Sequence, residues 1–409
     1  MREMKDSGVE WIGKIPRDWS VECLKYIYNK ANVGESIDKD YTTDDDNDYV
    51  FYTAGLKPIH TKYCDFPRNK YTKEHDLLLA RNGTPYVYLP NNNSVYSDHI
   101  IRISIENNVD RRFVRYSLQQ AIESLKVEVV SIATWSISLW KKQKLPLPQL
   151  VVQQRIADYL DSKCSQIDSI IEKQKQIIEK LKEYKTSLIT EVVTKGLDPN
   201  VEMKDSGVDF ILKIPANWNV SPIRYLFSLR EEKNYKQLKD VNLLSLYTDL
   251  GVFPHGEQEE RGNKAVTADG YKVVYKDDIV VNIILAWMGA IGISDYNGVT
   301  SPAYDVYKPN KNVCSRYYHY LFRTKLFSGE CYKYGRGIME MRWRTYSSEF
   351  KRIKVPVPSY DEQHQIADYL DLKCNQIDKT ISDRQIAIEK LHEYKKSLIY
   401  EVVTGKKEV

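Results

Sequence analysis

Cationic and aromatic side chains alternate along the stretch from Arg316 to Tyr346. Phosphate oxygens bind cationic donors and base edges bind forked or amide donors, so this pattern suits a nucleic acid. Residues 332–344 read YKYGRGIMEMRWR, and the two glycines let the backbone approach a ligand closely. A solvated basic surface has the same pattern, so this stretch alone leaves both interpretations open. The residues predicted here to contact nucleic acid are Asn282, Trp287, Lys333, Arg336, Arg342, Trp343 and Arg344.

A sparser set of the same residue types lies nearer the N-terminus. Residues 22–144 carry 17 Lys and Arg against 16 Asp and Glu, a net charge of +1, whereas residues 221–354 carry 21 against 15, a net charge of +6. The chain as a whole is only at +4, which permits a polyanionic partner without requiring one. The predicted contacts in the first segment are Lys62, Arg68, Arg81, Asn82, Tyr86, Lys141 and Lys142.

The sequence contains only partial matches to motifs that would indicate catalysis. NGTPY at residues 82–86 resembles the Asn-Pro-Pro-Tyr loop of amino-methyltransferases, but Gly83 and Thr84 follow the Asn where that loop has proline, so a turn is predicted instead. Asp161 and Lys163, like Asp371 and Lys373, match half of a nuclease motif. Two residues apart on a helix, they point to different faces and are expected to be solvated or seam charges. With no phosphate-binding loop, nucleophile elbow or metal-spaced His pair, no catalysis and no metal site are expected in this chain.

Bulk composition is that of a protein with hydrophobic cores. The 409 residues are 28% charged and 42% hydrophobic, which suits two or three domains. The N-terminal MREMKDSGVEW is too charged for a secretory signal, and no apolar run is long enough to span a bilayer, so a cytoplasmic location without membrane contact is expected. The six cysteines form no C-x-x-C pair, and Cys164 and Cys374 occupy matching places in a repeat, where buried small hydrophobes are expected.

The chain repeats itself. IADYLDSKCSQID at residues 156–168 recurs as IADYLDLKCNQID at 366–378, and residues 145–194 and 355–404 are identical at 29 of 50 positions. A shorter repeat joins MKDSGVEWIGKIPRDWSV at residues 4–21 to MKDSGVDFILKIPANWNV at 203–220. A period near 200 residues is too long for a solenoid and predicts two related domains, each followed by the same connector. The predicted boundaries are 1–145 and 201–355 for the domains, and 146–200 and 356–409 for the connectors.

The unlike segments between the repeats read as mixed strand and helix. Strands are predicted in residues 76–90 and 273–294, and short helices in 110–125 and 315–327. LPLPQL at 145–150 and VPVPSY at 355–360 are expected to stop any preceding strand, because proline cannot continue a hydrogen-bonded ladder.

Each long repeat has the hydrophobic period of a long helix. The stripe is interrupted by Lys163, Gln174 and Glu191 in the first copy and by Lys373, Thr380, Arg384 and Glu401 in the second. A dimerisation zipper or a helix lying on a domain core would give a similar stripe, but two matching helices on one chain favour antiparallel pairing with each other. The predicted seam is Ile156, Leu160, Ile167, Ile177, Leu181 and Leu188 with Ile366, Leu370, Ile377, Leu391 and Leu398, joined by Ile170, Tyr184 and Tyr394.

Taken together, these motifs resemble a known family. LPLPQLVVQQRIADYLD with KLKEYKTSLITEVVTKG, and VPVPSYDEQHQIADYLD with KLHEYKKSLIYEVVTGK, are similar to the conserved regions of the specificity subunit of Type I restriction-modification enzymes. DSGVEWIGKIPRDW and its second copy resemble the segment that opens each domain of that family, and NIILAWMGAIGISDYNGVTSPAY with GRGIMEMRWR resembles one of its recognition domains. The resemblance extends over essentially the whole chain.

The resemblance implies an α+β fold in which two mixed α/β target-recognition domains are separated by two long antiparallel helices, an intrachain coiled coil with a pseudo-two-fold arrangement. Each domain would read one half of a bipartite, asymmetric sequence in double-stranded DNA. The helices would dock two modification (methyltransferase) subunits, which carry S-adenosylmethionine and methylate adenine. Restriction subunits that use ATP and Mg would join them, so the chain itself would need no cofactor.

Two rival functions remain open at this point: a stand-alone enzyme such as a small nuclease, and a coiled-coil scaffold with no role in nucleic-acid binding. The leading interpretation also predicts that the helices act as a ruler. Each repeat from Ile156 to Val192 would span roughly 55 Å as a helix. Four residues inserted near Thr194 to Asn200 are expected to widen the unread gap by about one or two base pairs.

Overall fold

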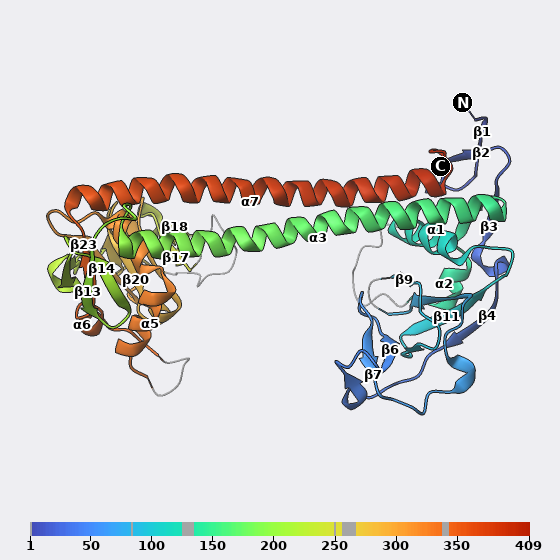
Figure 1. The fold of residues 1–409 in the computed structure, drawn as a ribbon, viewed down its shortest axis with the longest axis horizontal. Helices are drawn as coiled ribbons and strands as arrows, with labels where there is room; N and C mark the ends of the chain where they lie inside the picture. The colour runs from blue at the N-terminus through green and yellow to red at the C-terminus, as the bar shows by residue number, and fades with distance from the viewer. Residues whose placement is uncertain (1, 83–84, 125–134, 249–250, 256–266, 338–342) are drawn as a thin grey trace. The chain divides into compact units, whose positions relative to one another are not determined.

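The computed structural model describes residues 2–82, 85–124, 135–248, 251–255, 267–337 and 343–409 (Figure 1). The chain forms two compact units. Unit 1 consists of residues 1–174 with 385–409, and unit 2 of residues 175–384. Each unit therefore holds one recognition domain and part of both long helices. The boundaries predicted at 145, 200 and 355 separate the domains from the connectors, a different division from that into two compact units. They stay a prediction.

Unit 1 is built from short antiparallel sheets on helix α3. Its core sheet has the order β4-β11-β8-β9, and a second sheet has the order β10-β6-β7-β5 with β10 parallel to β6. The two-stranded sheets β1-β2 and β3-β12 hold the segment that opens the domain. The bounds are β1 Met4–Asp6, β2 Lys14–Pro16, β3 Ser20–Cys23, β4 Tyr28–Val33, β5 Thr42–Thr43, β6 Tyr49–Tyr52, β7 Ile59–Thr61, β8 Asp76–Ala80, β9 Val87–Tyr88, β10 Val95–Tyr96, β11 Ile100–Ile105, α1 Arg111–Ser124, α2 Ile137–Lys141, β12 Lys144–Leu147 and α3 Leu150–Lys195.

Unit 2 has an equivalent core sheet with different outer strands. The core sheet has the order β16-β23-β20-β21, and the two-stranded sheets are β13-β14, β15-β24, β17-β18 and β19-β22. The bounds are β13 Met203–Val208, β14 Ile211–Pro215, β15 Asn219–Pro222, β16 Phe227–Leu229, β17 Leu244–Tyr247, β18 Gly251–Pro254, β19 Lys272–Val274, β20 Ile279–Asn282, β21 Ile291–Ile293, β22 Gly298–Thr300, β23 Tyr304–Pro309, α4 Ser315–Phe322, α5 Lys325–Tyr334, α6 Ser347–Phe350, β24 Lys354–Val357 and α7 Tyr360–Val403. The strands and short helices predicted in the unlike segments are confirmed by β8, β9, β19, β20, β21, α1, α4 and α5.

The prediction that the proline pairs stop the preceding strands is wrong for the first proline of each pair. Pro146 lies within β12 opposite Val21, and Pro356 lies within β24 opposite Val220. A two-stranded sheet consists of edges only, so the missing N–H of proline can face away from the partner strand at no cost to the ladder. The strands end one residue later, just before Pro148 and Pro358.

Helices α3 and α7 run antiparallel within each unit. In unit 1, Lys395 Nζ donates to both carboxylate oxygens of Asp168, at 2.7 Å each. In unit 2, Lys185 Nζ donates to Asp378 at 2.7 and 2.6 Å. The repeat places one such pair in each unit. Each helix ends at a glycine with positive φ, Gly196 at +79° and Gly405 at +69°, a conformation that L residues avoid.

The buried stripe of the helices differs in phase from the predicted seam. Leu160, Leu188, Leu370 and Leu398 are buried, and Leu181 and Leu391 are half-buried, as the predicted seam requires. The seam position predicted at Ile170 and Ile177 lies one residue later in the structure. Ile170, Tyr184 and Tyr394 are 44%, 55% and 53% exposed, so their placement on the seam is wrong. The positions that take their place are Ala157, Cys164, Ile171, Ile178, Lys185 and Val192 on α3, with Ala367, Cys374, Ile381, Ile388, Lys395 and Val402 on α7.

The other predicted seam residues remain within the packed helices. Ile156, Ile167, Ile366 and Ile377 are buried, and Ile177 is half-buried beside the buried Ile178.

The predicted polar interruptions change accordingly. Lys163, Glu191 and Thr380 are exposed, whereas Gln174 and Arg384 are half-buried. Lys185 and Lys395 are charged residues that occupy the newly assigned position of the stripe, and each pairs with an Asp of the other helix. Cys164 and Cys374 are buried as predicted, and burial raises the pKa of both thiols. A paired polar position inside an apolar stripe is a known way to fix the register of two helices.

Candidate nucleic-acid interface

In unit 2, an aromatic stack lies beside two arginines at the end of α5. The rings of Tyr332 and Trp343 stack with centroids 4.9 Å apart, and Trp287 meets Tyr332 edge-on at 5.8 Å. Trp343 Nε1 donates to the carbonyl oxygen of Tyr332 at 2.9 Å. A Cβ on Gly335 would lie 2.2 Å from Trp343 Nε1, so the stack requires glycine at the end of this helix. The glycine noted in the sequence therefore serves the packing of a tryptophan.

Arg336 and Arg344 lie next to this stack. Their backbones pair as an antiparallel bridge, with the N–H of each donating to the carbonyl oxygen of the other at 2.9 Å. The Arg336 guanidinium donates to Glu349 Oε1 at 2.6 Å, and Arg352 approaches the other oxygen of Glu349 at 3.3 Å. Arg336 nevertheless keeps 69% of its side chain exposed. Glu349, which nothing in the sequence marked, positions a cation at the surface while leaving it accessible to a ligand.

The remaining predicted contacts of unit 2 are placed differently. Asn282 is buried, and its Oδ1 accepts hydrogen bonds from the N–H groups of Ile284 and Leu285 at 3.0 and 3.3 Å. That side chain holds the loop leading to Trp287 and does not present itself for base contact. Lys333 is exposed and pairs with Asp209, an ion pair that also raises the pKa of the lysine. Arg342 lies outside the described residues.

In unit 1, Arg81 and Asn82 follow β8 and are held by neighbouring loops. The Arg81 carbonyl accepts from the N–H of Trp135 at 2.6 Å, and Asn82 Nδ2 lies 2.7 Å from His99 Nδ1. The preceding carbonyl, of Ala80, accepts from Trp140 Nε1 at 3.2 Å. The backbone at the end of β8 is thus fixed while the Arg81 side chain is exposed.

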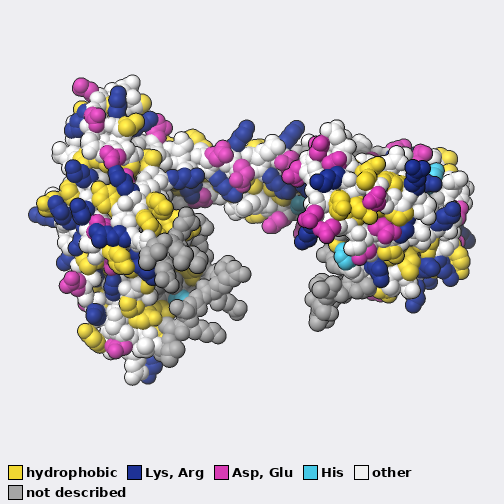
Figure 2. Space-filling view, turned by 90° about the horizontal axis from the view of Figure 1, so that it is seen from below, with side chains coloured by type: hydrophobic (Ala, Val, Ile, Leu, Met, Phe, Trp, Pro, Cys, Tyr) yellow, Lys and Arg dark blue, Asp and Glu magenta, His cyan; other side chains and the backbone are white. Residues whose placement is uncertain are grey.

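The other predicted contacts of unit 1 are distributed over several elements. Tyr86 is half-buried and packs edge-on against Tyr88. Lys62 and Arg68 are exposed just after β7, and Lys141 and Lys142 are exposed at the end of α2. These groups do not contact one another, so the described part of unit 1 shows no counterpart of the compact stack in unit 2. On the face shown in Figure 2, Lys and Arg side chains lie among Asp and Glu side chains, in keeping with the low net charge.

The acidic residues of the half nuclease motifs have structural partners. Asp161 and Asp371 are half-buried and accept hydrogen bonds from Tyr116 and Tyr320, each at 2.7 Å. Each carboxylate keeps 38% of its side chain exposed, so the expectation of solvated charges holds in part, but each also has a structural partner in its domain. Among the described residues, no group of three or more His, Cys, Asp or Glu could hold a metal ion, and no helix is both long and apolar enough to cross a membrane.

Two unlike mixed α/β domains, each built on the same pair of antiparallel helices, define the class of a duplicated recognition subunit. Residues 16–190 and 215–390 match the Type I restriction modification DNA specificity domain, and the chain belongs to this family. It is 22% identical over 425 residues to the Type I restriction enzyme MjaVIII specificity subunit of Methanocaldococcus jannaschii, covering 96% of this chain and 94% of that protein. It is 24% identical over 326 residues to the EcoBI specificity subunit of Escherichia coli, covering 73% and 67%.

Solved structures share the fold. A chain from a study of complex assembly and conformational transition of the type I R-M system has a TM-score of 0.67 at 12% identity, covering 95% of this chain and 98% of its own length. The HsdS subunit from Thermoanaerobacter tengcongensis has a TM-score of 0.54 at 13% identity, covering 98% and 100%. The predicted family, fold class and role in DNA recognition are thereby confirmed. The relatives are specificity subunits, in agreement with the expectation that catalysis resides elsewhere, and such subunits work with DNA and other restriction-modification subunits.

Proposed function

We propose that the two domains of this chain read two unlike half-sites of one bipartite DNA target. The observation that carries this proposal is the contrast between a shared scaffold and different surfaces. The core sheets have equivalent strand orders, but unit 2 presents the stack of Trp287, Tyr332 and Trp343 with two arginines, whereas unit 1 distributes its cations over several elements. Surfaces with different donors and shapes select different bases.

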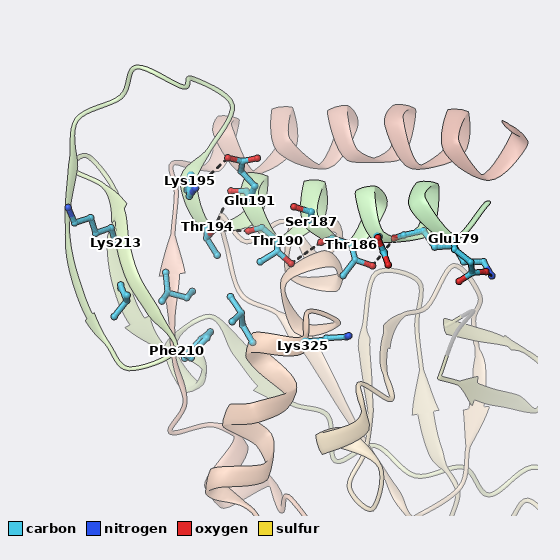
Figure 3. A pocket seen from close by; sticks show the side chains of 15 residues that line it. Glu179, Thr186, Ser187, Thr190, Glu191, Thr194, Lys195, Phe210, Lys213 and Lys325 are labelled. Carbon is cyan, nitrogen blue, oxygen red and sulfur yellow. Dashed lines mark hydrogen bonds and ion pairs between the residues drawn. The ribbon is translucent and has the colours of Figure 1, made fainter. Parts of the chain in front are cut away.

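We further propose that the chain docks two modification subunits, which carry S-adenosylmethionine, and that restriction subunits using ATP and Mg join the complex. Cytoplasmic action, where these subunits and their DNA would meet, is part of the same proposal. An open groove of about 940 Å³ in unit 2 supports docking of a protein (Figure 3). Thr186, Thr190 and Thr194 line it from α3, and Phe210 and Lys325 line it from other elements.

The groove offers apolar surface in spite of its threonines. Each threonine hydroxyl donates to a carbonyl of its own helix four residues earlier, at 3.0, 2.9 and 2.7 Å. Thr194 is buried, so the methyl groups of Thr186 and Thr190 remain for contact with a partner. Leu212 adds an apolar side chain that is 80% exposed at the rim. Exposed leucine beside satisfied polar groups is typical of a protein interface.

Adenine methylation mapped across the genome tests the proposal. Cells that express this chain with a modification subunit should methylate a sequence with two unlike halves separated by an unread gap. Cells that express the modification subunit alone provide the control. A symmetric or continuous motif would contradict the proposal, and methylation or cleavage by the purified chain alone would favour a stand-alone enzyme. Absence of DNA affinity even with the partner would favour a scaffold.

The ruler hypothesis needs a different insertion site from the one that the sequence suggested. A Cβ on Gly196 would lie 3.2 Å from Glu362 and 3.3 Å from Trp218, so the junction at residues 194–200 is packed within unit 2. An insertion there would disturb that packing. We instead propose one heptad inserted in both helices, after Gln174 and after Arg384, where the two units divide.

The matched heptads keep the buried stripe in phase and add about 10 Å of helix, which corresponds to up to about three base pairs. Methylation mapping should show a wider gap between unchanged half-sites. An insertion in α3 alone is the control, because it shifts the helices out of register and should abolish methylation. An active double insertion with an unchanged gap would rule out the ruler.

A further inference from the structure

One helix of each domain makes the same three contacts with a long repeat helix. The pairs are α1 with α3 in unit 1 and α4 with α7 in unit 2. In unit 1, Arg112 donates to Asp158 at 2.8 Å and to Asp161 at 3.0 Å. Tyr116, one helical turn later, donates its hydroxyl to Asp161 at 2.7 Å. The backbone N–H of Asp110 donates to Gln153 Oε1 at 2.9 Å. These contacts tie the start of α1 to one face of α3.

Unit 2 reproduces the set. Arg316 donates to Asp371 at 2.7 Å and to Asp368 at 2.5 Å, and Tyr320 donates to Asp371 at 2.7 Å. The N–H of Cys314 donates to Gln363 Oε1 at 2.9 Å. Three donors from α4 thus meet the same three acceptors on α7, although the surrounding sequences, RRFVRY and SRYYHY, have little else in common.

The glutamine acceptors on α3 and α7 are themselves held by hydrogen bonds. Gln153 Nε2 donates to the carbonyl of Pro148 at 2.7 Å, and Gln363 Nε2 donates to the carbonyl of Pro358 at 3.0 Å. Each glutamine is buried and therefore offers its Oε1 in one orientation. An acceptor with a fixed orientation, next to two carboxylates, favours one placement of the helix that packs against it, α1 or α4.

The donors also keep their protons over the whole physiological range. Burial and the hydrogen bond to Asp161 raise the pKa of Tyr116, and burial and Asp371 raise that of Tyr320. Burial by itself would lower the pKa of Arg112, but Asp158 and Asp110 outweigh it and the pKa is raised. The tyrosine and arginine donors therefore keep the protons that these contacts need.

The anchored helices lead directly to the candidate DNA contacts. Helix α1 packs against β8, which ends next to Arg81, and against β9. Helix α4 packs against β21 and α5, and α5 ends next to Arg336. A packed helix moves as a rigid element, so a change in its tilt on the repeat displaces the recognition surface.

We propose that Arg112, Tyr116, Arg316 and Tyr320 are positioning residues, which set the orientation of each recognition domain on its helix and thereby the spacing of half-sites that the protein accepts. This inference rests on the proposed function. Its prediction differs from that of a merely structural contact. Loss of stability would weaken binding to all targets alike, whereas loss of orientation would weaken discrimination between gaps of different length.

The test uses the full chain in complex with its modification subunit and duplexes that carry the mapped target with its natural gap, or with a gap one base pair shorter or longer. Wild-type protein should bind the natural gap best. Arg112→Ala should lower the preference for the natural gap by about fivefold, the net effect of one ordinary hydrogen bond, because the Arg112 side chain is partly exposed. Arg112→Lys keeps the charge within reach of the carboxylates and should restore most of the preference.

Two further variants keep the outcome interpretable. Asp158→Asn removes the negative charge that faces Arg112, at a side chain that is 68% exposed so that the fold is kept, and should reduce the preference in the same direction. Arg17→Ala removes an exposed ion pair of the same unit, with Glu3, and should leave it unchanged. If the Arg112 and Asp158 variants keep the wild-type preference, or weaken all three duplexes equally, the proposal is overturned. If wild-type protein fails to select the bipartite target, the proposed function fails instead.

Discussion

The two recognition domains differ at the surface and agree beneath it. Their core sheets have the order β4-β11-β8-β9 in unit 1 and β16-β23-β20-β21 in unit 2, which is the same order when the strands of each sheet are ranked along the chain. Outside that sheet, unit 1 adds the sheet β10-β6-β7-β5, whereas unit 2 adds the pairs β17-β18 and β19-β22. The shared parts are therefore expected to hold and orient the domain, and under the proposed function the parts that differ contact different bases.

The largest effect should be the same in both units. Leu160 and Leu370 occupy equivalent positions and are both fully buried. Replacing either with Ala should lower the free energy of unfolding by about 2 to 5 kcal/mol, through lost transfer energy and a cavity. Chemical denaturation measures it, and Leu372→Ala, at a site 57% exposed, is the control that should cost less than about 0.5 kcal/mol. A large cost at one leucine and almost none at the other would show that the scaffolds are not equivalent.

A smaller effect should separate the two surfaces. Arg336→Ala or Arg344→Ala should weaken binding of the target by about 1 to 3 kcal/mol if the residue reads a base, with relaxed specificity at one position. A phosphate contact would instead weaken all sequences alike. Gel shifts with target and unrelated duplexes distinguish the two. Arg352→Ala is the matched control, because Arg352 approaches the same Glu349 from a different element. Wild-type affinity and specificity in the double variant Arg336→Ala/Arg344→Ala would remove both residues from the interface.

The smallest expected difference between the units is that the free energy of unfolding of unit 2 falls in acid. Burial and the nearby Arg323 lower the pKa of His319 to about 3, and its Nδ1 accepts a hydrogen bond from the N–H of Ile293. The unfolded chain takes up this proton near pH 6.5 and the folded chain does not, so stability is complete above that pH and falls as the pH drops towards 3. Since the ring is partly exposed, the loss at pH 5 should be about 1 to 2 kcal/mol.

The variant His319→Gln keeps an acceptor for Ile293 and should reduce the acid sensitivity of the free energy of unfolding. The equivalent position of unit 1 is Arg115, so unit 1 has no histidine there and provides the internal comparison. Equal pH dependence in the wild type and the variant would show that His319 is protonated in the folded protein.

The sequence predicted the helices and their antiparallel pairing because the repeat carries a long apolar period. It misplaced one seam position because isoleucines stand side by side at Ile170 and Ile171 and again at Ile177 and Ile178, so hydrophobicity alone could not select the buried member. The small residues Ala157 and Cys164, which are buried, were the signal that could have done so. Pairings such as Arg336 with Glu349 depend on how loops fold back and leave no periodic trace.

The candidate contacts were predicted by residue type, and type does not determine direction. Asn282 was selected as an amide near the end of a strand, yet its side chain serves the loop. Arg81 was selected as a basic residue of the first segment and is exposed. The contacts of Arg112, Tyr116, Arg316 and Tyr320 with the long helices were not predicted, because these donors lie in segments that the repeat does not cover. Their equivalence is visible only in the fold, which brings them to equivalent acceptors.

The central claim is that each unit reads its own half-site independently of the other. Methylation mapping in cells that carry the modification subunit with wild-type chain, Arg81→Ala or Arg344→Ala tests it most directly. The account predicts a bipartite motif with two unlike halves, in which the Arg81 variant relaxes one half and the Arg344 variant relaxes the other, with the gap unchanged. A symmetric motif, or variants that both relax the same half, would contradict it.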